Sequence, residues 1–286
     1  MSDLADLVGH SYGPFTLEVT ADRVAEFADA TGDDAARWVE HAPPLLANVA
    51  LFAAAPAFLE DPAVVPFTTS LIHSEQSFEW HRSLVVGERL RVVGKVEGVK
   101  ARSGLNLVTF GLQAESDAGE WLDGTAVFVM ADAAAGALPE QPEPAVGERP
   151  PTDPPAPSRP LPNEGEPIVP LHVGASRLDL IRYAAATRDW NSIHWDHDSA
   201  RAAGLPGTIV HGLLMAAWMG RAAARYSPNA HSLAAMSVRF RKPLRPAEPA
   251  TVTGTVGAMA ADGADIDLVL ESGGDRLVTG RARVTR

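Results

Sequence analysis

Hydrophobic and polar positions follow the same order in two stretches of the chain. Each stretch opens with a short run in which apolar and polar residues alternate, as in a strand, and continues with apolar residues at helical spacing. The helical apolar positions are Val24, Phe27 and Ala28 in the first stretch and Leu180, Tyr183 and Ala184 in the second. Both stretches then reach Ala-Thr-x-Asp, with the aspartates at Asp33 and Asp189.

A longer apolar segment follows in each half, at residues 43–59 and 211–226. It is apolar nearly all round, which is typical of a helix that a sheet buries. Strand-like runs come next and match in register, at Phe78, Trp80, Leu84 and Glu88 in the first half and at Val238, Phe240, Leu244 and Glu248 in the second. A long helix followed by antiparallel strands predicts an α+β fold in which a sheet wraps around a helix, duplicated along the chain.

A proline-rich segment separates the halves, from about Ala133 to Pro170. Proline blocks helix and ladder hydrogen bonding and favours extended conformations, so this segment is predicted to be an interdomain linker. The predicted domains are residues 1–132 and 166–286, with the linker at 133–165. We expect the two units to lie side by side with continuous sheets. A disordered tail between unrelated modules is the alternative, and the matching halves disfavour it.

The halves differ most between the aspartate and the long helix. The second half has WNSIHWDHDSARAAGLPGTIV there, whereas the first half has only DAARWVEHA. The first half therefore lacks about a dozen residues and has no histidine at the matching place. Duplicated halves that diverge in this way often divide their roles, so we assign the chemistry to the second half and a structural role to the first.

The second half carries a long ordered motif. It runs from Asp189-Trp190-Asn191-Ser192-Ile193-His194-Trp195-Asp196 through Ala200 and Gly204 to Ile209-Val210-His211-Gly212. This motif resembles the signature of the MaoC-like, (R)-specific enoyl-CoA hydratase family, roughly Gly-Asp-x-Asn-Pro-Ile-His-x-Asp, then Ala, then Ile-x-His-Gly. Arg188 and Ser192 stand where the family often has Gly and Pro. Neither departure removes a reacting group, although Arg188 could narrow or charge the mouth of the pocket.

The first half also resembles a part of this family. With Trp80-His81-Arg82 on a predicted strand, it is similar to the degenerate hotdog domain that precedes the active one in two-domain members. The resemblance covers nearly the whole chain outside the linker. It implies a double hotdog fold, in which each of two antiparallel sheets wraps around a long central helix.

The resemblance implies reversible hydration of 2-enoyl-CoA to (R)-3-hydroxyacyl-CoA, with coenzyme A as part of the substrate and no separate cofactor. Asp189 and His194 would hold one water and pass protons both ways, and which of them is the base stays open. The backbone N–H of Gly212, at the start of the long helix, is the expected oxyanion donor. Asn191 and His211 are expected in supporting roles.

Neighbouring residues have structural alternatives beside the functional ones. Asp196 and Asp198 precede a helical run and are expected to cap it, and no standard zinc spacing appears, so no metal is predicted. Arg239, Arg241 and Lys242 either bind the phosphates of coenzyme A or form a solvated strand face. Four apolar residues of the first half could line an acyl tunnel or fill the core: Leu45, Leu46, Val49 and Phe52.

Composition narrows the class of protein. The 286 residues suit two domains, and the absence of cysteine excludes disulfides and thiolate chemistry. A formal net charge of −12 argues against a nucleic-acid partner. The chain shows no signal peptide and no apolar run of 18 residues, so we expect a cytoplasmic protein without a membrane span.

Alternative functions stay open at this point. A dehydratase for acyl carrier protein would use the same chemistry, but such carriers are acidic like this chain, which disfavours their association. Loss of the Asp–His pair would favour a non-catalytic subunit that binds acyl thioesters, and here the pair is present. The Asn-x-Ile-His loop argues against thioester hydrolysis on the same fold. A homodimer is left open, because the duplication already supplies one pair of hotdog units.

Overall fold

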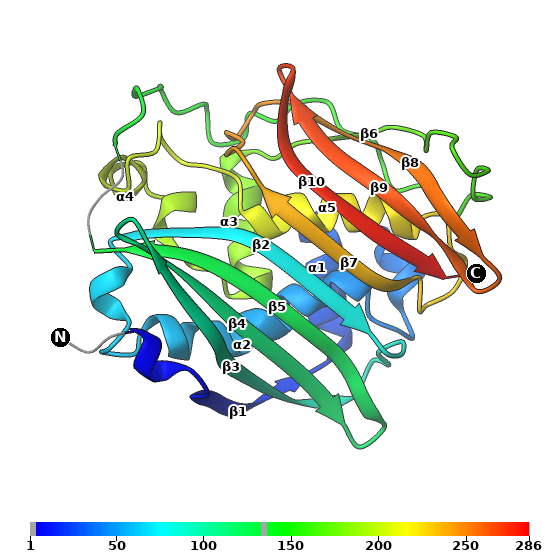
Figure 1. Cartoon of the computed structure of the whole chain (residues 1–286). Coiled ribbons are helices and arrows are strands. Elements are labelled where there is room, and N and C mark those ends of the chain that lie inside the picture. The colour runs from blue at the N-terminus through cyan, green and yellow to red at the C-terminus, as the bar shows by residue number, and fades with distance from the viewer. Residues whose placement is uncertain (1–3, 133–135, 286) are drawn as a thin grey trace.

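The computed structural model describes residues 4–132 and 136–285. Its described part holds one antiparallel sheet of ten strands, with the helices against one face (Figure 1). The strands of the first half are β1 (Ser11–Glu18), β2 (Ser70–Trp80), β3 (Arg89–Arg102), β4 (Leu105–Ser116) and β5 (Gly119–Ala131). Those of the second half are β6 (Leu171–Val173), β7 (Leu233–Phe240), β8 (Ala250–Ala260), β9 (Gly263–Ser272) and β10 (Asp275–Thr285). The helices are α1 (Ala21–Thr31), α2 (Ala47–Leu59), α3 (Arg177–Thr187), α4 (His197–Ala202) and α5 (Gly212–Ala224).

The strand order shows the duplication. It runs β1-β3-β4-β5-β2 and then β7-β10-β9-β8-β6, so both halves have the same order when they are followed outward from the centre. At the centre β2 pairs antiparallel with β7, with Ser77 opposite Ser237. The predicted α+β class, the duplicated topology and the continuous sheet are therefore confirmed.

The helices α2 and α5 are the central helices, and the sheet curves around them (Figure 1). In α5, 11 of 13 residues are buried, including Trp218 and Met219. A helix buried on all sides needs apolar residues on all sides, which explains the uniform apolar pattern of both segments. Burial of each large side chain contributes about 1.5–3 kcal/mol, so these two helices anchor the core.

The helices α1 and α3 end in the same backbone conformation. Their last turns are closed by Gly32 and Arg188, whose φ angles are 68° and 69°. This left-handed conformation costs a non-glycine residue about 1–2 kcal/mol, which explains the preference for glycine at this position. Arg188 adopts it nevertheless, so the chain leaves both helices in the same direction, toward Asp33 and Asp189.

A matching turn confirms the predicted register of the strands. The backbone N–H of Val85 donates to the carboxylate of Glu88 at 2.9 Å. The backbone N–H of Arg245 donates to the carboxylate of Glu248 at 3.2 Å. Each half therefore uses a glutamate to close the turn before its next long strand.

The predicted linker packs on the second half. Residues 136–170 form no helix, and their end runs beside β8, where Pro167 bridges Thr255 and Ile168 N–H donates to the Gly254 carbonyl at 3.0 Å. In Figure 1 they are the green trace that passes over the second half. The predicted boundaries at 132/133 and 165/166 stay predictions, and residues 133–135 of the predicted linker lie outside the described residues, as do the predicted domain ends 1–3 and 286.

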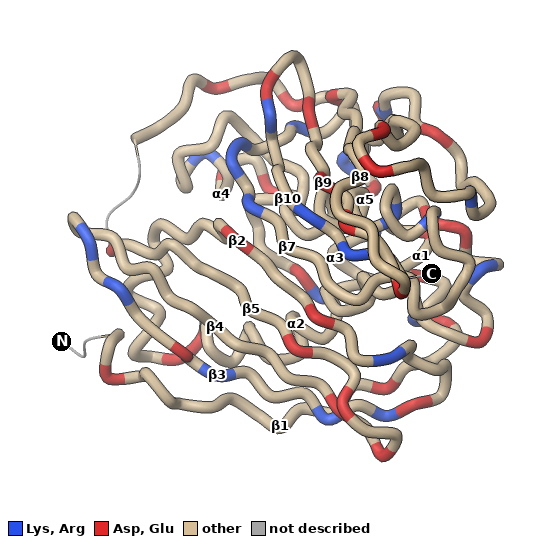
Figure 2. The backbone as a smooth tube through the Cα atoms, turned by 45° about the vertical axis from the view of Figure 1, so that its right-hand side comes forward, with Lys and Arg blue, Asp and Glu red and all other residues tan. Residues whose placement is uncertain are grey.

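Charged residues of both signs are interspersed over the whole backbone (Figure 2). This agrees with the composition, which has 24 Lys and Arg against 36 Asp and Glu. Among the helices of the described residues, none is both long and apolar enough to span a membrane.

Candidate active site

Three segments of the second half meet at one buried cluster. Asp189 follows the end of α3, His194 ends a 3-10 turn at Ser192–His194, and His211 immediately precedes α5. All three side chains are buried, and one oxygen or nitrogen of each lies within 4.8 Å of the others. The structure therefore brings together Asp189, His194 and the expected supporting residue His211.

His194 has one ring nitrogen committed to the backbone. Its Nδ1 lies 2.9 Å from the carbonyl oxygen of Ile209, which can only accept, so Nδ1 carries the proton. The other nitrogen, Nε2, then has a lone pair. Burial lowers the pKa of His194 to about 4, although the Ile209 carbonyl acts in the opposite direction. The ring is therefore neutral near pH 7, in a form that can accept a proton through Nε2.

Asp189 shows the opposite shift. Burial raises the pKa of its carboxyl to about 7, against a weaker effect of the Asn191 backbone N–H, which lies 3.5 Å away. A carboxyl with this pKa is partly protonated at neutral pH and can donate a proton. Because the two shifts are opposite, Asp189 holds a proton more readily than His194 does.

His211 connects the two segments that carry the pair. Its ring stacks on that of His194, with the centroids 3.7 Å apart and the planes at 24°. Its Nε2 donates to the backbone carbonyl of Asp189 at 3.3 Å. Burial and then the nearby His194 lower the pKa of His211 well below its usual value, so this ring is neutral as well. His211 thereby holds the backbone of Asp189 against the start of α5.

The same three residues are poorly arranged for a metal ion. The lone pairs of an imidazole lie in the ring plane, so two stacked rings direct their lone pairs side by side rather than toward one point. A zinc ion would need both nitrogens at about 2.0–2.1 Å with converging lone pairs. The Nδ1 of His194 is also occupied by Ile209. The geometry favours proton transfer over metal binding.

The first turn of α5 faces this cluster without a side-chain cap. Its N-cap residue, His211, makes no capping hydrogen bond with its side chain. The ring of Phe240 lies 3.4 Å from the position that a Cβ on Gly212 would occupy. A helix start presents backbone N–H groups and a positive partial charge, as the predicted oxyanion role of Gly212 requires.

Two further polar residues at the cluster are absent from the motif. Asn48 of α2 donates from Nδ2 to the Tyr183 hydroxyl at 3.1 Å and to the Leu213 carbonyl at 3.0 Å. The Tyr183 ring lies 4.9 Å from that of His211, and burial, followed by the charge of Asp189, raises the pKa of Tyr183 well above its usual value. Asn48 is the one polar residue of an otherwise apolar helix, which is the signal that could have identified it.

Residues 190–210, which we call the motif loop, hold the other polar residues that the sequence motif singled out. Asn191 begins the 3-10 turn, and its side chain accepts from the Ile193 backbone N–H at 3.3 Å. Asp196 caps α4 by accepting from Ser199 N–H at 2.7 Å, as predicted. The capping prediction was wrong for Asp198, because the helix begins at His197 and so includes Asp198 in its first turn, where a negative charge interacts favourably with the helix dipole.

The predicted phosphate-binding residues each have a partner in the protein. Arg239 pairs with Glu75 at 2.6 Å and Lys242 with Asp275 at 2.7 Å. Arg241 donates to the Thr279 hydroxyl at 3.1 Å. These contacts fit a solvated strand face, and a role in binding coenzyme A stays a prediction.

The apolar residues considered for an acyl tunnel lie in or against the core. Leu45, Leu46 and Val49 are buried, and Phe52 is a partly buried side chain packed against the hydrophobic core. Leu45 lies so close to Gly220 of α5 that a Cβ there would come within 2.3 Å of it. This tight contact joins the 3-10 turn Pro44–Leu46, which precedes α2, to the other central helix.

A surface groove of about 360 Å³ lies elsewhere, over the junction of β2 and β7. Its lining includes Ser77, Glu79, Ser237 and Arg281, and none of the residues of the buried cluster. None of the titratable residues that line the groove is buried, so the buried cluster is the better candidate for an active site.

Comparisons with known proteins match a different family model to each half. Residues 151–269 match the MaoC like domain, and residues 6–120 match the FAS1-like, dehydratase domain region. UPF0336 protein SCO4636 of Streptomyces coelicolor is 32% identical over 127 residues, which cover 40% of this chain and 85% of that protein. The mitochondrial 3-hydroxyacyl-[acyl-carrier-protein] dehydratase of Arabidopsis thaliana is 36% identical over 69 residues, 24% of this chain and 41% of that protein.

Solved structures share the fold over nearly the full length. A MaoC-like dehydratase superposes with a TM-score of 0.82 at 22% identity and covers 99% of both chains. Rv0216 of Mycobacterium tuberculosis, described as a double hotdog fold, superposes with a TM-score of 0.66 at 15% identity and covers 97% of this chain and 96% of that one. The double hotdog fold is therefore confirmed.

Proposed function

Because the chain belongs to the MaoC-like dehydratases, a family of hydro-lyases, we propose that it adds water to 2-enoyl-CoA to form (R)-3-hydroxyacyl-CoA, and catalyses the reverse reaction. The observation that carries the proposal is the buried pair of Asp189 and His194, whose pKa values move in opposite directions. Such a pair can accept one proton and donate another within a single site.

In the hydration step, Nε2 of His194 takes a proton from water while the water oxygen bonds to the β-carbon. The electrons of the double bond move toward the thioester oxygen, and the Gly212 N–H stabilises the charge that develops there. The protonated Asp189 gives its proton to the α-carbon. One water has then been added across the double bond, with each of its hydrogens accounted for.

The pair must then return to its starting state. After the step, His194 is positively charged and Asp189 is a carboxylate. A ring nitrogen of His194 and a carboxylate oxygen of Asp189 lie within 4.8 Å of each other, so the proton can move from His194 to Asp189 directly or through the next water. The charge left on Asp189 also stabilises the imidazolium during the step, which offsets the low basicity of the buried ring.

A thioester on acyl carrier protein is the second candidate substrate. The 36% identity to a 3-hydroxyacyl-[acyl-carrier-protein] dehydratase of Arabidopsis thaliana favours it. The net charge of −12 disfavours association with an acidic carrier. The intact pair also disfavours a subunit that only binds the thioester.

The test is the loss of the enoyl-thioester absorbance band when the protein is mixed with crotonyl-, octenoyl- or branched enoyl-CoA. We expect hydration of at least one of these substrates, and a chiral assay of the product should give the (R) isomer. The Asp189→Asn variant is the matched control. Tight binding of enoyl-CoA and hydroxyacyl-CoA without interconversion would contradict the proposal and favour a binding subunit.

A further inference from the structure

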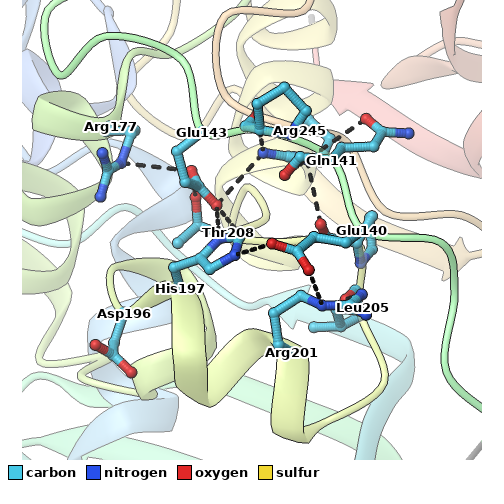
Figure 3. A network of polar contacts seen from close by, with 12 residues as sticks. Glu140, Gln141, Glu143, Arg177, Asp196, His197, Arg201, Leu205, Thr208 and Arg245 are labelled. Atoms are coloured by element: carbon cyan, nitrogen blue, oxygen red, sulfur yellow. Dashed lines mark hydrogen bonds and ion pairs between the residues drawn. The ribbon is translucent and has the colours of Figure 1, made fainter.

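The predicted linker places a carboxylate inside the second half. Glu143 accepts two hydrogen bonds from Thr208, at 2.7 Å from the backbone N–H and at 2.6 Å from the hydroxyl (Figure 3). It accepts a third from Nδ1 of His197 at 2.7 Å. The guanidinium groups of Arg245 and Arg177 lie 3.4 and 3.5 Å away. One linker residue thus contacts the end of the motif loop, the helix α4 and two further cations.

The chain before Glu143 follows the same loop. The backbone N–H of Leu138 donates to the Gly204 carbonyl at 2.8 Å, and that of Gln141 donates to the Pro206 carbonyl at 2.8 Å. We call residues 138–143 the clamp segment. Its backbone lies along the motif loop for several residues, so Glu143 is the end of an ordered contact rather than an isolated ion pair.

The clamp segment reaches the proposed base through one residue. Thr208 is fully buried and is followed directly by Ile209, whose carbonyl accepts from Nδ1 of His194 at 2.9 Å. The position of Thr208 therefore determines the position of the carbonyl that selects the tautomer of His194. Gly207 permits the approach of Glu143, because a Cβ there would lie 2.5 Å from a carboxylate oxygen.

Glu143 is held as a carboxylate. Burial raises the pKa of Glu143, but the hydrogen bonds from His197 and Thr208 and the charge of Arg245 outweigh it and keep the pKa below its usual value. A carboxylate accepts only, so it can satisfy all of these donors at once. Without the Glu143 carboxylate, the buried polar groups of Thr208 and Arg245 would lose hydrogen-bond and ion-pair partners.

We propose that Glu143 is a positioning residue for His194, acting from the linker through Thr208 and the Ile209 carbonyl to hold the ring in the tautomer whose Nε2 accepts a proton. The kinetic consequence rests on the proposed function, whereas the structural coupling does not. The linker is then a part of the active-site architecture rather than a tether between the halves.

His197 provides a direct report on this contact. Its Nδ1 faces Glu143 at 2.7 Å and its Nε2 faces Glu140 at 3.2 Å, and only the protonated ring can donate to both. These two contacts raise the pKa of His197 above its usual value. The charged groups around the ring and its carboxylate partners are Glu140, Glu143, Asp196, Arg177, Arg201 and Arg245.

The experiment compares Glu143→Gln with Glu148→Gln in the full chain. Glu148 lies in the same linker, is exposed, and accepts only a local hydrogen bond from the Ala145 N–H at 3.2 Å. Imidazole ¹⁵N NMR across a pH titration reports the tautomer of His194 and the pKa of His197. Steady-state kinetics with the best enoyl-CoA substrate give kcat and KM separately.

We expect Glu143→Gln to lower the pKa of His197, to mix the tautomers of His194, and to lower kcat by about ten- to a hundred-fold with KM little changed. Glu148→Gln should match the wild type in every readout. If Glu143→Gln does not fold, Thr208→Val removes the shorter hydrogen bond while keeping the backbone N–H, and should change His194 in the same direction.

Unchanged His194 resonances in folded Glu143→Gln or Thr208→Val would overturn the inference, even if turnover fell. A shift of these resonances in a protein that hydrates none of the substrates would support the coupling and contradict the proposed function. An equal response of Glu148→Gln would also overturn the inference, because it would trace the effect to linker charge in general.

Discussion

The two halves carry the same aspartate at the same helix end, in very different surroundings. Asp189 lies beside two stacked histidines and has a weak contact with one backbone N–H. Asp33 accepts from the indole N–H of Trp38 at 3.0 Å and from its neighbour's backbone N–H at 2.9 Å. These two donors fix the position of the Asp33 side chain, whereas Asp189 has only the weak contact and burial raises its pKa.

The space beside Asp33 is small. Next to Asp33 the hollow measures about 10 Å³, room for about one water, and Trp38, Leu45 and Arg221 help to line it. Arg221 comes from the second half and donates to the carbonyls of Thr31 and Gly32, where it closes the end of α1. Side chains therefore occupy most of the space beside Asp33, and one of them, Arg221, also stabilises the end of α1. The comparison teaches that the same helix end places an aspartate in both halves, and that the inserted loop of the second half surrounds it with the two histidines of the proposed site.

The largest effect is expected from loss of the proposed catalytic pair. Asp189→Asn and His194→Gln should each lower turnover by about 10²–10⁴, because general acid–base groups contribute this much. The double variant should be far less than multiplicatively worse, since both residues act on one water. Stopped assays with the substrate that the wild type hydrates measure this. Near-normal turnover in either single variant would contradict the proposed role of the second half.

The pH profile of kcat/KM distinguishes the acid from the base. If Asp189 donates a proton, activity should fall about tenfold per pH unit above its pKa of about 7, and fall again below the His194 pKa of about 4. If Asp189 were the base, activity would instead rise through pH 7. The reverse reaction also requires the pair to carry one proton in total, so its pH profile should fall in the same two pH ranges.

The stability of Asp189→Asn should depend on pH in a defined direction. The raised pKa means that the folded wild type binds this proton more tightly than the unfolded chain, so its contribution is present below about pH 4 and is lost as pH rises toward 7. Between pH 4 and pH 8, the unfolding free energy of the variant should therefore increase by about 2–4 kcal/mol relative to that of the wild type. Urea unfolding at both pH values measures it, and the His194 contribution largely cancels because both proteins carry it. If the difference in unfolding free energy between variant and wild type were the same at both pH values, the pKa of Asp189 would not be raised.

Asn48→Leu tests the contribution of the first half to the site. It keeps the side-chain volume but removes the donor to Tyr183 and to the Leu213 carbonyl. The unsatisfied buried groups should cost about 1–3 kcal/mol of unfolding free energy. Turnover should fall because Tyr183 contacts His211, whose ring supports the pair. Unchanged stability and turnover would show that the halves do not cooperate at this point.

The smallest effect is expected for Asp33→Asn. Its partners are the Trp38 indole and a backbone N–H, and its surroundings contain no equivalent of His194. Turnover should stay within a few-fold of the wild type. A loss comparable to that of Asp189→Asn, in a protein with an unchanged circular dichroism spectrum, would end the division of roles between the halves.

Sequence alone determined the features that depend on local pattern. The order of strands and helices, the duplication, and the Asp189 and His194 motif follow from the spacing of apolar residues and from a short ordered run of polar ones. The residues that form each single pattern lie close together in the sequence, so each pattern, and its repetition in the second half, is readable before the chain folds.

Tertiary structure decided the contacts between distant residues and the environment of each charge. Asn48 meets Tyr183 across 135 positions and Glu143 meets Thr208 across 65, and no periodicity connects either pair. The pKa shifts of Asp189 and His194 arise chiefly from burial, which exists only once the sheet and helices have closed around them. A proline-rich stretch is typical of a spacer, so the role of Glu143 becomes apparent only when the fold lays this segment along the motif loop.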